Sequence, residues 1–380
     1  MIYLDSGATT LEKPPAVARA MAQAVGEMSS PGRGNYPASQ KAARTAYDCR
    51  EAAAELFHVP APEQVIFTCN ATHGLNIAIR TLVSPGCRVA VSGYEHNAVT
   101  RVLHSIPGVE IMVADAPLFR PEQTLEGFHT ALRRGVDAVI CNHVSNVFGC
   151  VQPVEELAGL CRRTHTPLIV DASQSAGILP VLLADWGAAF VAMPGHKGLY
   201  GPQGTGLLLC GAEASPLLYG GTGSASRRQT MPIDLPDRLE AGTHNMPGIA
   251  GLLEGLRFVS HAGVERIAQW ERRLTRRAEE GLARLPGVEV FADKTGQSQT
   301  GVLSFCVKGM DCEQVGEELA RRQIAVRAGL HCAPLAHRTA GTLESGTIRI
   351  SPSVFNTEGQ INFFLREMRE ILRENTKKSV

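Results

Sequence analysis

The stretch Met193-Pro-Gly-His-Lys-Gly-Leu-Tyr-Gly-Pro-Gln-Gly-Thr-Gly206 decides how the rest of the chain is interpreted. An apolar strand candidate, Ala189–Met193, ends directly at Gly-His-Lys, and the chain then becomes rich in glycine. A lysine at a strand end, flanked by backbone that permits close approach, suits a cofactor aldehyde. The alternative is a surface loop with an ordinary solvated lysine. A P-loop is excluded, because Gly-x-x-x-x-Gly-Lys-[Ser/Thr] is absent.

On both sides of this stretch, apolar segments of strand length alternate with longer segments of helical period. The alternation predicts an α/β protein with a largely parallel sheet covered by helices. The strand candidates are Gln64–Thr68, Arg88–Ser92, Ala138–Asn142, Leu168–Asp171, Ala189–Met193 and Gly206–Cys210. The helical segments include Ser39–Phe57, Ala71–Thr81, Val154–Thr164 and Pro247–Ser260.

After Gly263 the pattern changes. A charged amphipathic helix, Val264–Leu285, leads into strand–helix–strand units with strands near Val302–Val307 and Ile348–Ser351, and a final helix covers Thr357–Asn375. The chain of 380 residues is long enough for two domains. We predict a large domain over residues 15–260 and a smaller α+β domain over residues 261–380, against which residues 1–14 pack.

Composition narrows the classes of function. Lys+Arg and Asp+Glu are equal at 37 each, so no overall field favours nucleic acid or an anionic membrane. The ten cysteines contain no C-x-x-C pair. No window approaches the roughly 20 apolar residues of a membrane span, and no signal peptide pattern opens the chain. We expect a cytoplasmic protein with free thiols, whose partners are small molecules or protein.

Leu168-Ile-Val-Asp-Ala-Ser-Gln-Ser-Ala-Gly177 precedes Lys197 by one βα unit. Its aspartate, Asp171, ends a buried strand candidate, where open α/β sheets place their ligands. In an enzyme that uses pyridoxal 5'-phosphate (PLP), a carboxylate there keeps the pyridine nitrogen protonated and makes the ring an electron sink. The alternative is a helix N-cap. Asp171 and Lys197 each strengthen the cofactor interpretation of the other.

Two further strand ends carry polar residues. Phe67-Thr-Cys-Asn-Ala-Thr72 ends a strand and opens a helix, so free N–H groups and the helix dipole would meet a phosphate there, and the Thr72 hydroxyl can add a donor. An ordinary first helical turn is the alternative. His96 follows the strand that ends at Ser92, where an imidazole can stack on a flat cofactor ring and move protons. A structural role is the commoner one for a lone histidine.

The segment Ile324-Ala-Val-Arg-Ala-Gly-Leu-His-Cys-Ala-Pro334 begins as a strand, and its second half predicts a mobile loop carrying Cys332. Neighbouring His331 and Arg327 would favour the thiolate, which is the nucleophilic form of cysteine. The alternative is a semi-buried structural thiol. Arg349, in Gly346-Thr-Ile-Arg-Ile-Ser351, has a planar fork that suits a substrate carboxylate, with a surface strand arginine as the alternative.

In this combination and order the motifs resemble the class V, PLP-dependent aminotransferase-fold family, and more narrowly its cysteine desulfurases and selenocysteine lyases. The resemblance extends from Tyr3-Leu-Asp-Ser-Gly-Ala-Thr-Thr10 to Pro352-Ser-Val-Phe-Asn-Thr357. It implies the PLP-dependent transferase fold of type I, which is like aspartate aminotransferase, with a mostly parallel seven-stranded sheet in the large domain.

The resemblance implies PLP as the cofactor and assigns the residues around its ring. Lys197 would hold PLP as a Schiff base, and Asp171 would pair with the pyridinium nitrogen. Gln174 would contact the phenolic oxygen of the ring, and His96 would stack on the ring.

The resemblance also assigns the phosphate site. Ala71, Thr72 and His196 would hold the phosphate within one chain. Thr243, in Leu239-Glu-Ala-Gly-Thr-His-Asn245, would reach the phosphate of the neighbouring subunit, which implies a homodimer with shared sites.

For the substrate, the resemblance implies that Arg349, with Arg327, clamps the carboxylate, and that Asn146, in Val144-Ser-Asn-Val-Phe-Gly149, lies near the ring and that carboxylate. Lys197 would remove the Cα proton of L-cysteine. Cys332 would then attack the substrate sulfur, leaving a persulfide on the enzyme and L-alanine. A sulfur acceptor, such as another protein, would then take the sulfur from the Cys332 persulfide.

Several alternatives stay open. One is a selenocysteine lyase, and another is a different class V reaction such as transamination or epimerisation. A third is a sulfur-carrier or scaffold protein without catalysis. No metal site is expected, because Cys141 and His143 lie two apart without a second ligand pair.

Three positions depart from the family pattern and bear on the substrate. Leu330 replaces the first of two histidines that usually precede the cysteine in group II desulfurases. Pro194 stands where a serine usually helps to bind phosphate, and proline supplies neither an N–H nor a hydroxyl. Tyr36 occupies a region that commonly carries a histidine.

Overall fold

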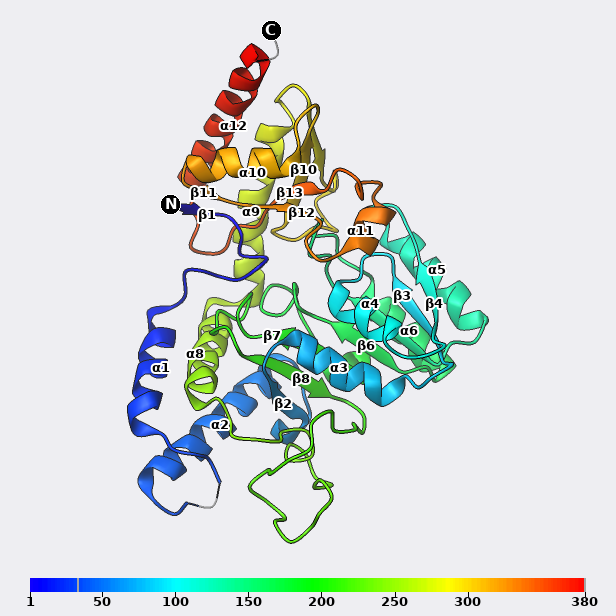
Figure 1. Cartoon of the computed structure of the whole chain (residues 1–380), viewed down its shortest axis with the longest axis vertical. Coiled ribbons are helices and arrows are strands. Elements are labelled where there is room, and N and C mark those ends of the chain that lie inside the picture. The colour runs from blue at the N-terminus through cyan, green and yellow to red at the C-terminus, as the bar shows by residue number, and fades with distance from the viewer. Residues whose placement is uncertain (33, 379–380) are drawn as a thin grey trace.

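A seven-stranded sheet forms the centre of the structure, a computed structural model that describes residues 1–32 and 34–378 (Figure 1). Its strand order is β2-β8-β7-β6-β5-β3-β4. Strand β8 runs antiparallel to β2 and β7, and the other neighbouring pairs are parallel. The strands are β2 (Val65–Thr68), β3 (Arg88–Ser92), β4 (Glu110–Ala114), β5 (Ala138–Asn142), β6 (Leu168–Asp171), β7 (Phe190–Pro194) and β8 (Gly206–Cys210). The predicted seven-stranded, mostly parallel sheet is confirmed.

Both faces of this sheet are covered, which explains the continuous apolar runs of its strands. Successive residues of β5 alternate between two core clusters: Val139 and Cys141 join one, and Ala138 and Ile140 join the other. Helices α2 (Pro37–Leu56), α5 (Pro121–Arg133), α6 (Val154–Thr164) and α8 (Met246–Ala262) contribute to the first cluster. Helices α3 (Ala71–Leu82) and α4 (Asn97–His104) contribute to the second.

The C-terminal part of the chain builds a second sheet of four antiparallel strands with its own apolar core. The strand order is β12-β13-β10-β9. The strands are β9 (Val288–Phe291), β10 (Leu303–Val307), β12 (Arg327–Gly329) and β13 (Thr347–Ile350). Helices α9 (Val264–Leu282), α10 (Cys312–Arg321) and α12 (Glu358–Lys378) accompany it, and α11 (Pro334–Thr339) follows β12.

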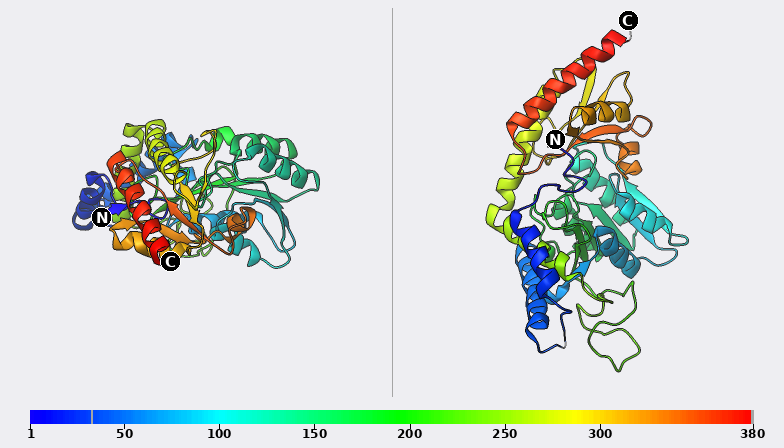
Figure 2. Two further views of the ribbon diagram at one scale, coloured as in Figure 1. Left: turned by 90° about the horizontal axis from the view of Figure 1, so that it is seen from above. Right: turned by 60° about the vertical axis from the view of Figure 1, so that its left-hand side comes forward.

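Long helix α9 connects the two parts, as Figure 2 shows in its right-hand view. The beginning of the chain lies with the second part, because β1 (Ile2–Tyr3) pairs in parallel with β11 (Ile324–Ala325). Helix α1 (Pro15–Glu27) returns to the first part and packs against α8. The predicted domain limits of 15–260 and 261–380 stay a prediction, but this pairing fits the placement of residues 1–14.

The carboxyl ends of the parallel strands meet at one edge of the large sheet, and this edge faces the second part of the chain (Figure 1). The loops at this edge carry the polar residues that follow β3, β5, β6 and β7. No helix among residues 1–32 and 34–378 is long and apolar enough to span a membrane.

Candidate active site

Lys197 follows β7 in a tight loop that requires glycine on both sides. A Cβ on Gly195 would lie 2.2 Å from Thr205 Oγ1, and one on Gly198 would lie 2.4 Å from the carbonyl oxygen of Ala176. The loop therefore packs directly on the loop that follows β6. Burial lowers the pKa of Lys197 to about 8, against the opposing effect of the nearby Asp171 charge. A lysine so tuned supplies a neutral, nucleophilic amine at mildly alkaline pH.

Asp171 ends β6 and is buried. Its Oδ1 accepts a hydrogen bond of 2.9 Å from the backbone N–H of Ser173. Its Oδ2 accepts none from the part of the chain that the structure describes. The alternative role as a helix N-cap is wrong, since the chain after β6 forms turns and the next helix is α7 (Leu183–Trp186). Asp171 is thus a buried residue that offers a free carboxylate oxygen at the sheet edge.

His96 is the N-cap of α4. Its Nδ1 accepts a hydrogen bond of 3.0 Å from the backbone N–H of Ala98, so the proton of the neutral ring resides on Nε2. Burial lowers the pKa of His96, with Asp171 raising it and the positive charges of Lys197 and Arg349 lowering it further. The ring is therefore neutral and lies within the electrostatic reach of Asp171 and Lys197.

The predicted phosphate ligands lie at the starts of helix α3 and of the Lys197 loop. Asn70 caps α3 by accepting from the N–H of His73 at 2.9 Å, which leaves the N–H groups of Ala71 and Thr72 without a partner in the described chain. The Nδ1 atom of His196 is buried and also lacks a partner there. Burial lowers the pKa of His196 to about 4, so its ring is neutral.

Thr243 is exposed and lines a hollow together with Cys69 and His73 of its own chain. Its predicted contact with the phosphate of a neighbouring subunit stays a prediction. Gln174 is buried, and its Nε2 donates to the carbonyl oxygen of Gly7 at 2.8 Å. One of its two amide hydrogens is therefore taken, and the other remains for the predicted contact with the ring.

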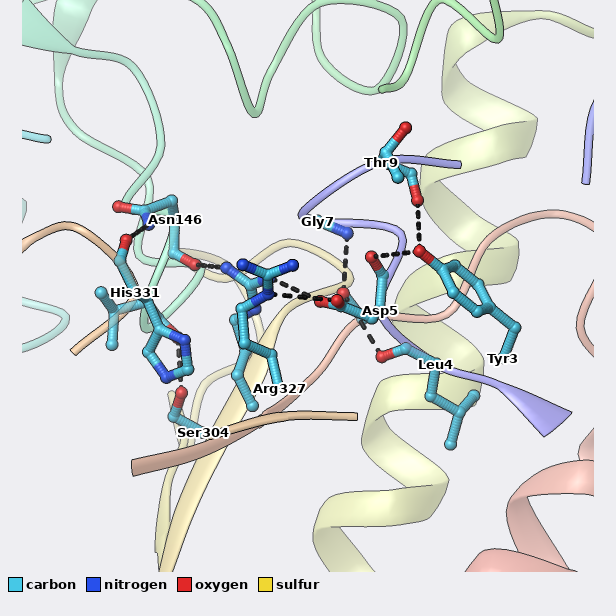
Figure 3. Close-up of polar contacts among 12 residues, drawn as sticks. Tyr3, Leu4, Asp5, Gly7, Thr9, Asn146, Ser304, Arg327 and His331 are labelled. Carbon is cyan, nitrogen blue, oxygen red and sulfur yellow. Dashed lines mark hydrogen bonds and ion pairs between the residues drawn. The ribbon is translucent and has the colours of Figure 1, made fainter. Parts of the chain in front are cut away.

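Arg349 is buried in β13, with 2% of its surface exposed, so the alternative of a surface strand arginine is wrong. Its Nη2 contacts Asp5 Oδ1 at 2.7 Å, and its Nη1 donates to the carbonyl oxygen of Asn146 at 2.8 Å. The Nε atom is buried and has no partner in the described chain. Arg327 is exposed, and its Nε contacts Asp5 Oδ2 at 3.1 Å. Figure 3 shows Asp5 beside Arg327.

Cys332 is exposed on a short turn between β12 and α11, where a mobile loop was expected. The turn is held at two successive carbonyl oxygens. Asn146 Nδ2 donates to the carbonyl oxygen of His331 at 2.8 Å, and the backbone N–H of Asn97 donates to the carbonyl oxygen of Cys332 at 2.8 Å. Since Asn97 follows His96, the turn docks on the start of α4. His331 and Cys332 adopt positive φ values of 49° and 56°.

The expected assistance of His331 to the thiolate is wrong. Its ring is buried, contacts Thr347 Oγ1 through Nε2 at 3.1 Å and stacks on His337. Burial and the charge of Arg349 lower its pKa to about 2, so the ring carries no positive charge. Arg327, the other expected neighbour, is paired with Asp5.

Two buried carboxyl groups at this site were not predicted. Asp5 lies within the quoted Tyr3–Thr10 motif, but nothing in that motif indicates its partners. Glu95 directly precedes His96, and its Oε1 is hydrogen-bonded to Ser92 Oγ at 2.6 Å and accepts from the N–H of Asn142 at 2.8 Å. Burial raises the pKa of Glu95 to about 8. Glu95 thus links the ends of β3 and β5 through these two hydrogen bonds. The signal for it in the sequence was a charged residue directly before the histidine at the end of a strand.

A half-buried lysine and a buried aspartate at the edge of a mostly parallel sheet, with an arginine clamp facing them, define an enzyme of the aminotransferase type. The model of the family described as Aminotransferase class-V matches residues 2–364, and the chain belongs to this family. The predicted family, fold class and enzyme class are therefore confirmed.

Curated relatives carry the name probable cysteine desulfurase. That of Mycolicibacterium paratuberculosis is 32% identical over 98% of this chain, which spans only 55% of that protein. That of Methanothermobacter thermautotrophicus is 31% identical over 97% of this chain and 94% of its own length.

Solved structures that resemble this chain also carry the name cysteine desulfurase. The apo cysteine desulfurase of Thermococcus onnurineus NA1 has a TM-score of 0.89 at 30% identity and covers 98% of this chain and 95% of its own. The cysteine desulfurase CsdA of Escherichia coli has a TM-score of 0.83 at 26% identity and covers 98% of this chain and 94% of its own.

Proposed function

We propose that this chain is a PLP-dependent cysteine desulfurase, which converts L-cysteine to L-alanine and takes the sulfur onto Cys332 as a persulfide. The observation that carries the proposal is the docking of the Cys332 turn on Asn97, the residue after His96. An exposed thiol thereby belongs to the same sheet edge as Lys197 and Asp171. The names of the curated relatives support this reaction.

The residues present fit PLP. The free Oδ2 of Asp171 suits a protonated ring nitrogen, and the unpartnered N–H groups of Ala71 and Thr72 suit a phosphate. His196 Nδ1, which is buried and has no partner in the described chain, would add a further phosphate contact. Lys197 would anchor the aldehyde. When bound, PLP supplies an electron sink that stabilises negative charge developing at the substrate Cα.

Arg349 would bind the substrate carboxylate through the N–H groups that Asp5 and Asn146 leave free, including the buried Nε. The neutral Lys197 amine would then take the Cα proton. His96, with its proton on Nε2, would lie over the ring and hold a proton near the reacting atoms.

Cys332 would attack the substrate sulfur as the thiolate. An S–S bond forms while the C–S bond breaks, and the electron pair of the broken bond stays with the substrate carbon, which takes up a proton to give alanine. The turn that carries Cys332 docks on the start of α4, because the backbone N–H of Asn97 donates to the carbonyl oxygen of Cys332.

We further propose a homodimer in the cytoplasm, in which Thr243 completes the partner's phosphate site and a protein accepts the sulfur. The exposed apolar side chains Leu218, Tyr219 and Ile233, on the long segment between β8 and α8, support an association surface. Sedimentation of the wild type and of a Tyr219→Ser, Ile233→Ser variant tests this. A monomeric wild type would contradict the dimer.

The reaction is tested by the absorption spectrum of the PLP-loaded protein and by alanine formation from L-cysteine and L-selenocysteine. We expect visible absorbance that Lys197→Ala abolishes, and alanine from L-cysteine that Cys332→Ala abolishes. Alanine from L-selenocysteine alone would identify a selenocysteine lyase. A Cys332→Ala variant with full activity would indicate a different class V reaction, and a colourless, inactive protein would indicate a carrier or scaffold.

A further inference from the structure

A hydrogen-bond network joins the ends of β3 and β5 directly before His96. It is formed by Ser92, Glu95 and Asn142, and all three residues are buried. The Ser92 hydroxyl oxygen lies 2.6 Å from Glu95 Oε1 and 2.8 Å from Asn142 Oδ1. Glu95 Oε1 also accepts from the backbone N–H of Asn142 at 2.8 Å. Three side-chain oxygens therefore meet within hydrogen-bonding distance.

The orientation of the Asn142 amide is fixed by its other contact. Asn142 Nδ2 donates to the carbonyl oxygen of Tyr94 at 2.8 Å, so a reversed amide would set two acceptor oxygens against each other at that distance. The atom of Asn142 beside Ser92 is therefore Oδ1, which can only accept a hydrogen bond.

The number of hydrogens in the network then determines the state of Glu95. Ser92 has one hydroxyl hydrogen and Asn142 Oδ1 requires it, so the hydrogen between Ser92 and Glu95 has to come from the carboxyl group. A protonated Glu95 donates from Oε1 to Ser92 Oγ, which donates in turn to Asn142 Oδ1. An ionised Glu95 would leave one of these two short contacts as a contact between two acceptors.

Two further features favour a neutral Glu95. Its Oε2 atom is buried and has no partner in the described chain, so the charge of an ionised carboxylate would rest partly on an oxygen without a donor. Asp171 lies in register with Asn142 on the adjacent strand β6. Burial, reinforced by the Asp171 charge, raises the pKa of Glu95 to about 8.

The other titratable groups around Glu95 supply no counter-charge. Burial raises the pKa of the Cys141 thiol on β5 and lowers the pKa of the His96 ring, so both groups are neutral. The cations Lys197 and Arg349 act on His96, and neither forms an ion pair with Glu95 in the described chain. A negative charge on Glu95 would therefore have no paired cation.

The network borders the backbone of two residues that are proposed to contact the PLP ring. Glu95 directly precedes His96, so the position of its side chain constrains the start of α4. The N–H of His143, which follows Asn142, donates to the carbonyl oxygen of Asp171 at 2.9 Å. A change in the network would thus be felt on both sides of the ring site.

We propose that Glu95 is a positioning residue that carries a proton at neutral pH. As a neutral acid it completes the hydrogen-bond chain through Ser92 to Asn142, holds the backbone that carries His96, and leaves the negative charge at this sheet edge to Asp171. The inference rests on the proposed function, because it takes His96 and Asp171 as residues that contact the PLP ring. Ionisation of Glu95 would open the chain and set a second negative charge near Asp171.

Infrared spectroscopy of the PLP-loaded protein at pH 7 detects the proton directly, because a protonated carboxyl group has a carbonyl stretching band separate from those of a carboxylate. The variant Glu95→Gln should lose this band. Glu271→Gln is the matched control, since Glu271 is the other buried glutamate whose pKa burial raises to about 8, and it should lose only its own band. A Glu95→Gln spectrum with the full wild-type intensity of protonated carboxyl groups would overturn the inference.

The pH dependence of kcat for alanine formation from L-cysteine tests the positioning role. Between pH 7 and pH 9 the wild-type kcat should fall by about tenfold, because the protonated fraction of an acid with a pKa of about 8 falls by that factor. The amide of Glu95→Gln cannot ionise and can still donate to Ser92, so its kcat should change by less than about twofold over this range. An equal fall in both proteins would overturn the inference. Alanine formation by the wild type at pH 7 tests the proposed function separately, because the infrared band does not depend on turnover.

Discussion

Replacing Arg349 by lysine tests the carboxylate clamp. The guanidinium group uses separate nitrogens for Asp5 and for the carbonyl of Asn146, at 2.7 and 2.8 Å, and keeps Nε for a ligand. A lysine keeps the charge, but its single ammonium group cannot reach all three positions. At least one hydrogen bond to a charged group is lost, which costs about 1.5–3 kcal/mol. The expected result is a rise of about 10- to 150-fold in KM for L-cysteine.

Steady-state alanine formation in the PLP-loaded enzyme measures this effect, with KM and kcat determined separately. The matched control is Arg338→Lys, because Arg338 is exposed and lies outside the clamp. A KM within about twofold of the wild type in Arg349→Lys, with the visible absorbance intact, would show that Arg349 does not bind the substrate.

Three further predictions concern the cofactor, the turn and stability. Because burial lowers the pKa of Lys197 to about 8, the rate of PLP uptake by the cofactor-free protein should rise with pH and level off near pH 8. The Asp171 charge raises the pKa of Lys197, so Asp171→Asn should move this plateau to lower pH, and uptake that still rises at pH 10 would contradict the prediction. Asn146→Ala leaves the His331 carbonyl unpaired, a loss of about 1–3 kcal/mol, so persulfide formation in rapid-quench experiments should slow by about 5- to 150-fold. An unchanged rate would show that the turn needs no such support. Burial raises the pKa of Glu271 to about 8, so its protonated carboxyl contributes stability that is complete below about pH 4.5 and is lost as the pH rises through 8. The variant Glu271→Gln should therefore show a smaller fall in Tm between pH 6 and 9 than the wild type. An equal fall in both proteins would refute this prediction.

The large sheet was predictable because most of its strands are buried on both faces. Strands β5 and β6 have the predicted bounds, and every residue in them is buried. The edge strand β4 (Glu110–Ala114) was not predicted. Only its last residue is fully buried, and Val113 is 42% exposed, so the segment lacks the continuous apolar run of a central strand.

Within the site, the residues at strand ends were predictable because parallel strands end at one edge of the sheet. The partners of Asp5 were not, since its contact with Arg349 joins positions that lie 344 residues apart in the chain and no periodicity reports such a contact. The neutral state of His331 was missed for a similar reason. Its burial results from packing on His337 and Thr347, whereas the sequence shows only that a histidine precedes Cys332.

The most direct test of the proposed reaction is the mass of the Cys332 peptide after one turnover with L-cysteine. In the described chain Cys69 and Cys332 are the exposed cysteines, so Cys69→Ser is the matched control. The proposed reaction predicts that the Cys332 peptide gains the mass of one sulfur atom in the wild type and in Cys69→Ser, in step with the alanine released. Alanine formation with an unmodified Cys332 peptide, or sulfur carried by Cys69 instead, would contradict it.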